Sequence, residues 1–194
     1  MAASATPVWD VLVFVVLPLW LIAGVADYLC HRAEHIEQGT GARESALHWL
    51  MLGETGIALA AATWLRVNAL VFAFLLGCLV VHELTSHIDG RYARRTRHIG
   101  VFEFQVHTLL EMMPFAALLL LAVLHWPQAE ALFGLGREHA DWTLALKEPP
   151  SLRVVLPFAF AFFLFGVVPY AEEFWRGLRA SRGSAARVRG LPPS

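Results

Sequence analysis

Five long apolar runs alternate with shorter polar segments along the chain. Each run holds roughly the 20 residues that an α-helix needs to cross the hydrocarbon core of a membrane. The runs predict helices over residues 9–30, 44–65, 69–88, 101–125 and 151–175. Asp89 and Gly90 are expected to stop the third helix, and Pro157 and Pro169 are expected to kink the fifth. The pattern therefore predicts an all-α integral membrane bundle of five transmembrane helices.

The polar segments divide into short connections, one long connection and a basic tail. Residues 128–150 form the long connection, in which a short interfacial helix is expected around 129–135. Residues 179–194 are rich in arginine, glycine and serine, and this composition predicts disorder. We therefore expect a single transmembrane helical domain over residues 1–178.

The arginines predict the orientation of the bundle. Five spans place the segments around residues 32–43, 91–97 and the basic tail on one side, and these segments hold most of the basic residues. Short basic loops face the cytoplasm, so the N-terminus is predicted outside and the C-terminus inside. Trp9, Trp64 and Trp126 fall at the predicted outer ends, as expected for an aromatic belt. This orientation suits a multi-pass protein of the bacterial inner membrane.

Composition supports a membrane protein and disfavours a nucleic-acid binder. The chain is 57% hydrophobic and 16% charged, whereas soluble domains contain about 25% charged residues. The net charge of −1 disfavours a nucleic-acid binder, which needs a basic surface. Cys30 and Cys78 both lie in apolar segments and imply no disulfide framework.

Acidic residues and histidines are paired in four of the five predicted helices. Each pair consists of an acid followed four residues later by a histidine, so its two side chains share one helix face. The pairs are Asp27–His31, Glu44–His48, Glu83–His87 and Glu103–His107. Random placement of the 16 acids and 9 histidines gives roughly 0.7 such pairs. Ionisable groups inside apolar helices are costly, which favours a functional role.

All four pairs lie at the predicted cytoplasmic ends, at similar depths. Imidazole and carboxylate together suit iron, manganese or zinc, and in a helical bundle they form dinuclear centres. The candidate ligands are Asp27, His31, His35, Glu44, His48, His82, Glu83, His87, Glu103 and His107. We expect two metal ions, with iron as the first choice and zinc as the alternative. Glu54, Glu83 and Glu111 are candidate catalytic acids or bases.

The competing interpretation is that these groups only reach toward the interface or pair with the arginines of residues 91–97. Glu172 and Glu173 are expected to be ordinary interfacial charges at the end of the fifth helix. His98 is expected at the surface of the basic loop.

The segments DYLCHRAEH, ESALH, HELTSH and EFQVHTLLE, within residues 27–111, resemble in design the membrane-bound, histidine-rich di-iron oxygenases. That group includes fatty acid desaturases and hydroxylases, and it also presents its ligands at the cytoplasmic ends of transmembrane helices. The adjacent histidines of its motifs are absent here, since the chain has no His-His pair. The resemblance implies a di-iron oxidoreductase that hydroxylates or desaturates a lipid-like substrate and receives electrons from a donor protein.

Three alternatives remain open from the sequence. A zinc-dependent membrane hydrolase would use an acid such as Glu83 as general base. A metal or proton transporter would extend the polar path inward through Glu54 and Glu111. A b-type cytochrome would use two axial histidines from different helices and would leave the carboxylates unexplained.

Overall fold

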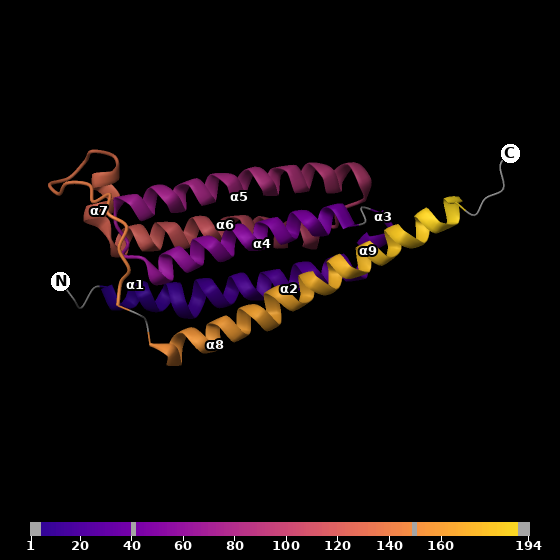
Figure 1. Ribbon diagram of the computed structural model, residues 1–194, viewed down its shortest axis with the longest axis horizontal. Coiled ribbons are helices and arrows are strands. Elements are labelled where there is room, and N and C mark those ends of the chain that lie inside the picture. The colour runs from indigo at the N-terminus through magenta and orange to yellow at the C-terminus, as the bar shows by residue number, and fades with distance from the viewer. Residues whose placement is uncertain (1–4, 40–41, 149–150, 190–194) are drawn as a thin grey trace.

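The protein is a bundle of long helices, seen here in a computed structural model that describes residues 5–39, 42–148 and 151–189. Long helical segments run side by side along the long axis, and the C-terminal helical segment crosses them diagonally (Figure 1). The described part contains no β-strand, only an isolated bridge between Leu65 and Leu146. The all-α prediction is therefore confirmed.

The first long helix combines α1 (Ala5–Val11), the π-helical turn η2 (Leu12–Val16) and α2 (Leu17–Ala33). The short α3 (Ile36–Gly39) leads to α4 (Ala42–Trp64), which is followed by α5 (Ala69–Thr96) and α6 (Val101–Leu124). The short α7 (Trp126–Leu132) lies in the long connection, close to the position expected for an interfacial helix. The diagonal helix combines α8 (Leu152–Phe162), the π-helical turn η3 (Phe163–Val167) and α9 (Val168–Arg189).

Among the described residues, four helices are long and apolar enough to cross a membrane, as expected of a multi-pass membrane protein. They cover Pro7–Ala33, Ala69–Thr96, Val101–Leu124 and Leu152–Arg182. Their outward faces carry large apolar side chains, including Phe14 and Ile22, which hydrocarbon chains would cover. Helix α4 has a comparable length, but His48 and Glu54 interrupt its apolar sequence. The fifth span and the orientation of the termini stay predictions.

Two predicted helix ends are wrong. Helix α5 continues through Asp89 and Gly90 to Thr96, because a single interior glycine costs only about 1 kcal/mol and Asp89 is buried inside the bundle. Helix α9 continues to Arg189, so residues 179–189 of the expected disordered tail are helical. Residues 190–194 of that tail lie outside the described residues.

Prolines account for the two π-helical turns. Pro18 follows η2 and Pro169 follows η3 by two residues, and proline supplies no N–H to the carbonyl one turn before it. The backbone widens instead: the Leu17 N–H donates to the Leu12 carbonyl, and the Val168 N–H donates to the Phe163 carbonyl. Pro169 thus distorts the fifth long helix where a kink was expected, without breaking it.

The two ends of the bundle have different cores. At the end where α4 meets α5, Val71, Phe72, Leu75 and Leu121 form an apolar core. Asn68 begins α5 there, and its side-chain oxygen accepts a hydrogen bond from the Val71 N–H. Leu12, Val16 and Met113 join the first helix to α6. The opposite end, where α2, α4, α5, α6 and α9 come together, is polar inside.

Candidate metal centre

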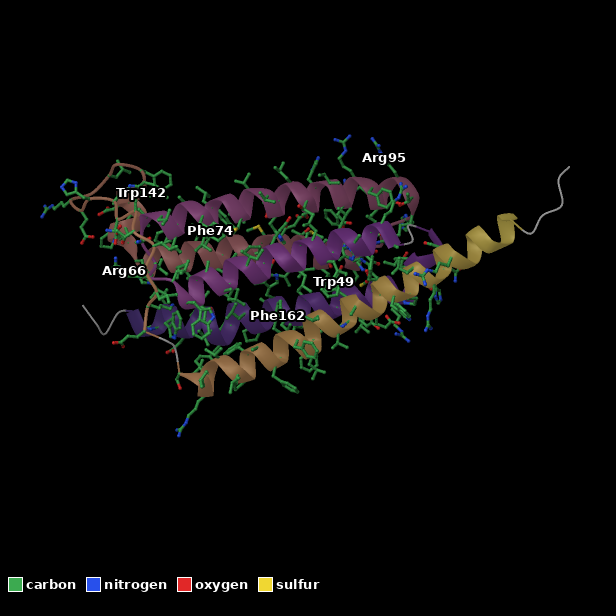
Figure 2. All side chains as sticks on the ribbon, in the orientation of Figure 1. Trp49, Arg66, Phe74, Arg95, Trp142 and Phe162 are labelled. Atoms are coloured by element: carbon green, nitrogen blue, oxygen red, sulfur yellow. The ribbon has the colours of Figure 1, made fainter. Side chains whose placement is uncertain are left out.

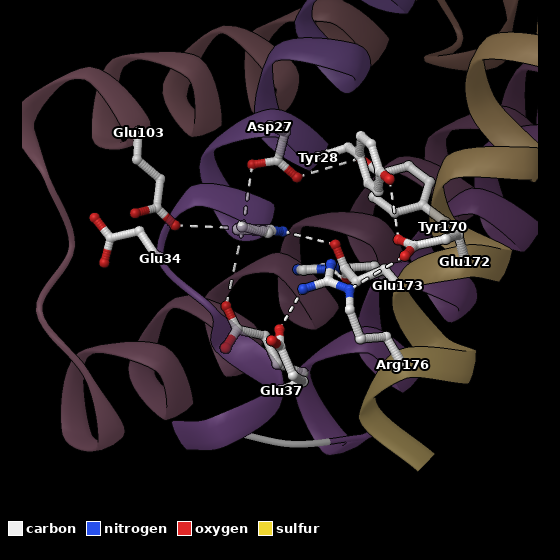
Figure 3. A network of polar contacts seen from close by, with 12 residues as sticks. Asp27, Tyr28, Glu34, Glu37, Glu103, Tyr170, Glu172, Glu173 and Arg176 are labelled. Carbon is white, nitrogen blue, oxygen red and sulfur yellow. Dashed lines mark hydrogen bonds and ion pairs between the residues drawn. The ribbon is translucent and has the colours of Figure 1, made fainter. Parts of the chain in front are cut away.

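The polar end of the bundle contains eight acidic and histidine side chains from five helices, which we call the polar cluster. Its members are Asp27 and His31 of α2, Glu44 and His48 of α4, Asp89 of α5, Glu103 and His107 of α6, and Glu173 of α9. All except His107 are at most 4% exposed. Figure 3 shows Asp27, Glu103 and Glu173 pointing inward from three different sides. The convergence expected at the cytoplasmic ends of the helices is therefore present for these elements.

Glu173 holds two imidazole rings of the polar cluster. Its Oε2 lies 3.0 Å from His31 Nδ1, and its Oε1 lies 2.9 Å from His48 Nδ1. A carboxylate can only accept hydrogen bonds, so both Nδ1 atoms carry the proton. The two rings stack with centroids 4.7 Å apart and planes inclined by 6°. This carboxylate–imidazole arrangement is the one that orients metal-binding histidines in proteins.

The free nitrogens of these two rings face carboxylate oxygens. His31 Nε2 lies 3.3 Å from Glu103 Oε1 and 3.5 Å from Asp27 Oδ1, and His48 Nε2 lies 3.4 Å from Asp89 Oδ2. A neutral ring protonated at Nδ1 directs a lone pair toward these oxygens, which is repulsive unless a metal cation lies between them or Nε2 also carries a proton. Two ligands that are each about 2.1 Å from one metal ion are roughly 3.0–3.4 Å apart, close to the separations found here.

Hydrogen bonding agrees with a place for a cation. Among the described residues, His31 Nε2 and Asp89 Oδ1 are buried without a hydrogen-bond partner. Unsatisfied polar atoms in a protein interior cost free energy and call for an explanation, such as an ion. The residues of the polar cluster therefore fit a bound metal.

Two overlapping triads can hold a metal ion in the described part of the chain. One consists of Asp27, His31 and His107, and the other of His31, Glu44 and His48; in each, the ligand atoms lie within 4.8 Å of one another. His107 Nε2 lies 2.7 Å from Asp27 Oδ1. Because His31 Nδ1 donates its proton to Glu173, only His31 Nε2 can bind a metal ion, and His31 can serve one of the two triads at a time.

Arg97 is the cation that the structure places beside the polar cluster. Its guanidinium donates to Glu44 Oε1 at 2.6 Å and to Glu103 Oε2 at 2.9 Å, and its side chain is 8% exposed. Burial lowers the pKa of Arg97, but the carboxylates of Glu103 and Glu44 raise it above its usual value. Arg97 follows the last residue of α5, in the connection where it was expected, and its pairs with Glu44 and Glu103 are of the kind that the competing interpretation predicts.

The net charge of the polar cluster depends on its three histidines. With neutral histidines, the five carboxylates and the guanidinium of Arg97 leave four negative charges in a buried region, and with all three histidines protonated they leave one. Uncompensated charge in a protein interior costs several kcal/mol per ion. Two divalent cations would neutralise the four negative charges that remain with neutral histidines.

A second polar group lies further along the bundle. His82 Nδ1 is 3.4 Å from Glu54 Oε2, and Thr85 Oγ1 donates to Glu54 Oε1 at 2.8 Å. Ser86 Oγ donates to Glu111 Oε1 at 2.6 Å. We call the first two residues the Glu54–His82 pair. These predicted residues thus lie together, but outside the two triads.

Four predicted ligands are not brought to the polar cluster: His82, which faces Glu54, and His35, Glu83 and His87. His35 is exposed in the turn after α2, where its φ is 53° and its Nδ1 lies 3.3 Å from Glu37 Oε1. Glu83 and His87 are exposed on α5. The buried face of that helix instead carries His82, Thr85 and Asp89.

Sequence reasoning missed Asp89 and Glu173 as members of the polar cluster. Asp89 follows His82 by seven residues, so the two share a helix face, whereas His87 does not. A similar signal exists for Glu173. It is spaced three or four residues from its neighbours in the series Gly166, Tyr170, Glu173 and Gly177, so these residues lie on one face of the diagonal helix. Tyr170 Oη donates to Asp27 Oδ2 at 3.3 Å, which adds it to the edge of the polar cluster (Figure 3).

A cavity of about 820 Å³ extends from the polar cluster along the inside of the bundle. Asp27, His48 and His107 line it at the polar end, and Trp9 and Trp64 line it toward the opposite end. The side chains between them are mostly apolar, and Figure 2 shows side chains filling the space around the ribbons. The cavity lining thus connects the polar cluster with the apolar end of the bundle.

Comparisons of the chain with protein-family models, with curated proteins and with solved structures found no match in any of the three.

Proposed function

We propose that the protein is a membrane metalloenzyme, a di-iron oxidoreductase that hydroxylates or desaturates a lipid-like substrate. The observation that carries this proposal is the pair of Glu173-oriented imidazoles, whose free nitrogens face buried carboxylates at the separations of metal ligands. Bound iron would supply the activation of O₂ at the polar cluster. The donor set of imidazole and many carboxylates favours iron or manganese.

The number of donors supports a dinuclear centre. A mononuclear catalytic zinc site uses three protein ligands, and the polar cluster offers eight side chains. With neutral histidines as metal ligands, the four negative charges of the polar cluster would also match two divalent ions. Zinc remains the alternative metal, and with zinc the same residues would serve a hydrolase.

Geometry disfavours the other two alternatives. The rings of His31 and His48 stack directly on each other and leave no space for a haem between them. A transporter needs polar groups along its whole path, but beyond the Glu54–His82 pair the cavity is lined mainly by residues such as Leu75, Leu118 and Leu121.

The cavity supports a substrate that dissolves in the membrane. In a hydroxylation, one oxygen atom of O₂ would enter a C–H bond and the other would leave as water. A desaturation would instead remove two hydrogens from the substrate, and both oxygen atoms would leave as water. Either reaction consumes two electrons and two protons from outside the substrate, which an electron-donor protein would supply.

We further propose that α4 is a fifth span and that the polar end faces the cytoplasm of a bacterial inner membrane. The polar end carries Arg91, Arg94 and Arg95 on α5 and Arg179 and Arg182 on α9, which supports this orientation. An electron donor from the cytoplasm would then meet the end of the bundle that holds the polar cluster.

The proposal is tested with iron-loaded protein in lipid vesicles, an electron donor and isotopically labelled O₂. We expect reduction-dependent uptake of O₂ and either labelled oxygen in a lipid product or a newly unsaturated lipid. His48→Ala and His107→Ala should abolish the reaction, and His139→Ala, outside the polar cluster, should retain it. Full activity in both cluster variants, or a reaction in zinc-loaded protein without O₂, would overturn the assignment.

A further inference from the structure

The cavity opens sideways between α5 and α6, at the polar end of the bundle. A residue that is exposed on the surface and also lines a cavity marks a mouth of that cavity. Arg94 of α5 and Phe104 and Thr108 of α6 meet both conditions. A second cavity of about 460 Å³ adjoins this mouth, and its lining shares Arg94, Ile99 and Phe104 with the larger cavity. We call this mouth the α5–α6 opening.

Side-chain contacts define the two ends of the α5–α6 opening. At one end, the Arg94 guanidinium lies over the Phe104 ring, 5.7 Å from its centroid. At the other end, Ser86 Oγ donates to Glu111 Oε1 at 2.6 Å. Because α5 and α6 run in opposite directions, these two contacts align the helices with each other. Ser86 and Arg94 are eight positions apart, so the opening extends along about 12 Å of helix.

Gly90 and His107 lie between these two contacts, and both line the cavity. A Cβ placed on Gly90 would meet no other part of the bundle within 4 Å. The side chain of His107 is 19% exposed, whereas those of the other members of the polar cluster are at most 5% exposed. The opening therefore leaves one member of the polar cluster accessible, because the position on α5 that is aligned with it carries no side chain.

The charge of Arg94 is unpaired. Among the described residues, no carboxylate forms an ion pair with Arg94, which contacts the Phe104 ring instead. Arg97 is engaged by carboxylates of the polar cluster, and Glu34, which lies 4.0 Å from Arg97, lines neither cavity. His98 adds a second basic side chain to the smaller cavity. This end of the opening therefore attracts an anion.

The position of Arg94 in the membrane indicates which anion is present. The candidate spans Ala69–Thr96 and Val101–Leu124 end and begin beside the smaller cavity, so Arg94 lies close to the membrane surface. The phosphates of lipids lie at this level, and their hydrocarbon chains begin just inside it. Arginine binds phosphate through charge-assisted hydrogen bonds, and basic pockets between transmembrane helices bind anionic lipid head groups.

We propose that the α5–α6 opening admits an acyl chain of an anionic phospholipid from the surrounding leaflet, with the phosphate at Arg94 and His98 and the chain beside His107. This inference rests on the proposed function, because it names the substrate class of the same site. Gly90 is four positions from Arg94, which correspond to about 6 Å of helix. The part of the chain nearest the head group, and not its methyl end, therefore passes the polar cluster.

The cavity has another opening along α8, where the exposed residues Val154 and Ala159 line it. Lys147 also lines the cavity at that end of the bundle, and its Nζ donates to the Ala62 carbonyl at 2.8 Å. A lipid that entered there would bring its methyl end to the polar cluster. The two routes place the same lipid against different helices.

Photo-labelling of wild-type protein in vesicles distinguishes the two routes. The probes are phosphatidylglycerol and phosphatidylcholine that carry the same diazirine in the acyl chain near the ester. We expect phosphatidylglycerol to label residues 86–94 of α5 and 104–111 of α6, and phosphatidylcholine to label them about tenfold less at equal mole fraction, corresponding to about 1.4 kcal/mol. Label on α8 alone, no label in the bundle, or equal labelling by both lipids would overturn the inference.

Two matched pairs of variants test the head group and the opening separately. Arg94→Gln should reduce labelling by phosphatidylglycerol to that by phosphatidylcholine. Arg95→Gln removes the same charge from an exposed position that lines neither cavity, so it should keep the preference. Gly90→Leu should fill the opening and lower labelling by both lipids about tenfold. Gly77→Leu, on the same helix but outside the cavity lining, should leave labelling unchanged. Equal effects within either pair would contradict the assigned roles.

The labelling requires neither bound metal nor turnover. The metal content of each sample is measured in parallel, and wild-type protein without metal would overturn the proposed function while the labelling still decides the route. Inorganic phosphate is added as a competitor in a further sample. Loss of the preference for phosphatidylglycerol in that sample would assign Arg94 and His98 to free phosphate and would overturn the lipid head group.

Discussion

The two ends of the bundle contain different kinds of interaction. The end around Val71, Phe72 and Leu75 is held by apolar packing, with a capped helix start at Asn68. The end around His31, Glu44 and Glu173 buries charged and imidazole groups that are each at most 1% exposed. Burial of charged groups costs free energy that apolar packing does not, so the polar end carries a cost that the apolar end lacks. The comparison predicts that substitutions at the two ends affect stability and metal binding differently.

The largest effect on stability is expected for Arg97→Ala. Removal of the guanidinium leaves Glu44 and Glu103 buried together without their shared cation, and the loss of one partner of a buried ion pair costs about 3–5 kcal/mol. Thermal unfolding in detergent checks this prediction. Arg95→Ala, an exposed neighbour, is the matched control. Equal Tm values for the two variants would show that Arg97 is not a structural bridge.

Leu75→Ala tests the apolar end. The substitution opens a cavity in a packed core and should cost about 2–3 kcal/mol of the free energy of unfolding. The metal content should stay at its wild-type value, because Leu75 does not contact the polar cluster. A loss of bound metal in this variant, measured by elemental analysis at a temperature where the protein is folded, would show that the two ends are not separate.

Glu173→Gln, unlike Leu75→Ala, should lower the affinity of the protein for metal. The amide has one oxygen and one NH₂ group, so it cannot accept hydrogen bonds from both Nδ1 atoms of His31 and His48. Loss of a group that orients metal-binding histidines typically lowers metal affinity 10–100-fold. Competition with a metal chelator measures the change. Glu172→Gln, its partly exposed neighbour, should bind metal like the wild type, and equal weakening in both variants would contradict the assigned role.

The smallest effect is expected for His87→Ala and His35→Ala. Both side chains are exposed and lie outside the triads, so metal content and Tm should be unchanged. Elemental analysis of both variants beside His48→Ala provides the comparison. Metal loss in His87→Ala comparable to that in His48→Ala would mean that α5 presents its other face to the centre.

The helical fold and the position of the polar end could be predicted from local sequence patterns. The length of an apolar run and the helical spacing of polar residues can both be recognised within a single helix. Pairing at four residues identified Asp27–His31, Glu44–His48 and Glu103–His107, which all lie in the polar cluster. The same rule selected Glu83 and His87, since it does not state which face of α5 is inside. Arg97 contacts Glu44, and Glu173 contacts His48 and His31. The two residues of each of these contacts are more than 50 positions apart in the sequence. Such contacts depend on how the helices pack, which no local pattern records.

The number of metal ions in wild-type protein tests the central claim most directly. The protein is purified from cells in detergent, and elemental analysis is combined with an optical spectrum. We predict two divalent metal ions per chain, with iron as the metal and no haem band. Protein that carries no metal, and takes up none after incubation with ferrous iron or zinc, would contradict the account.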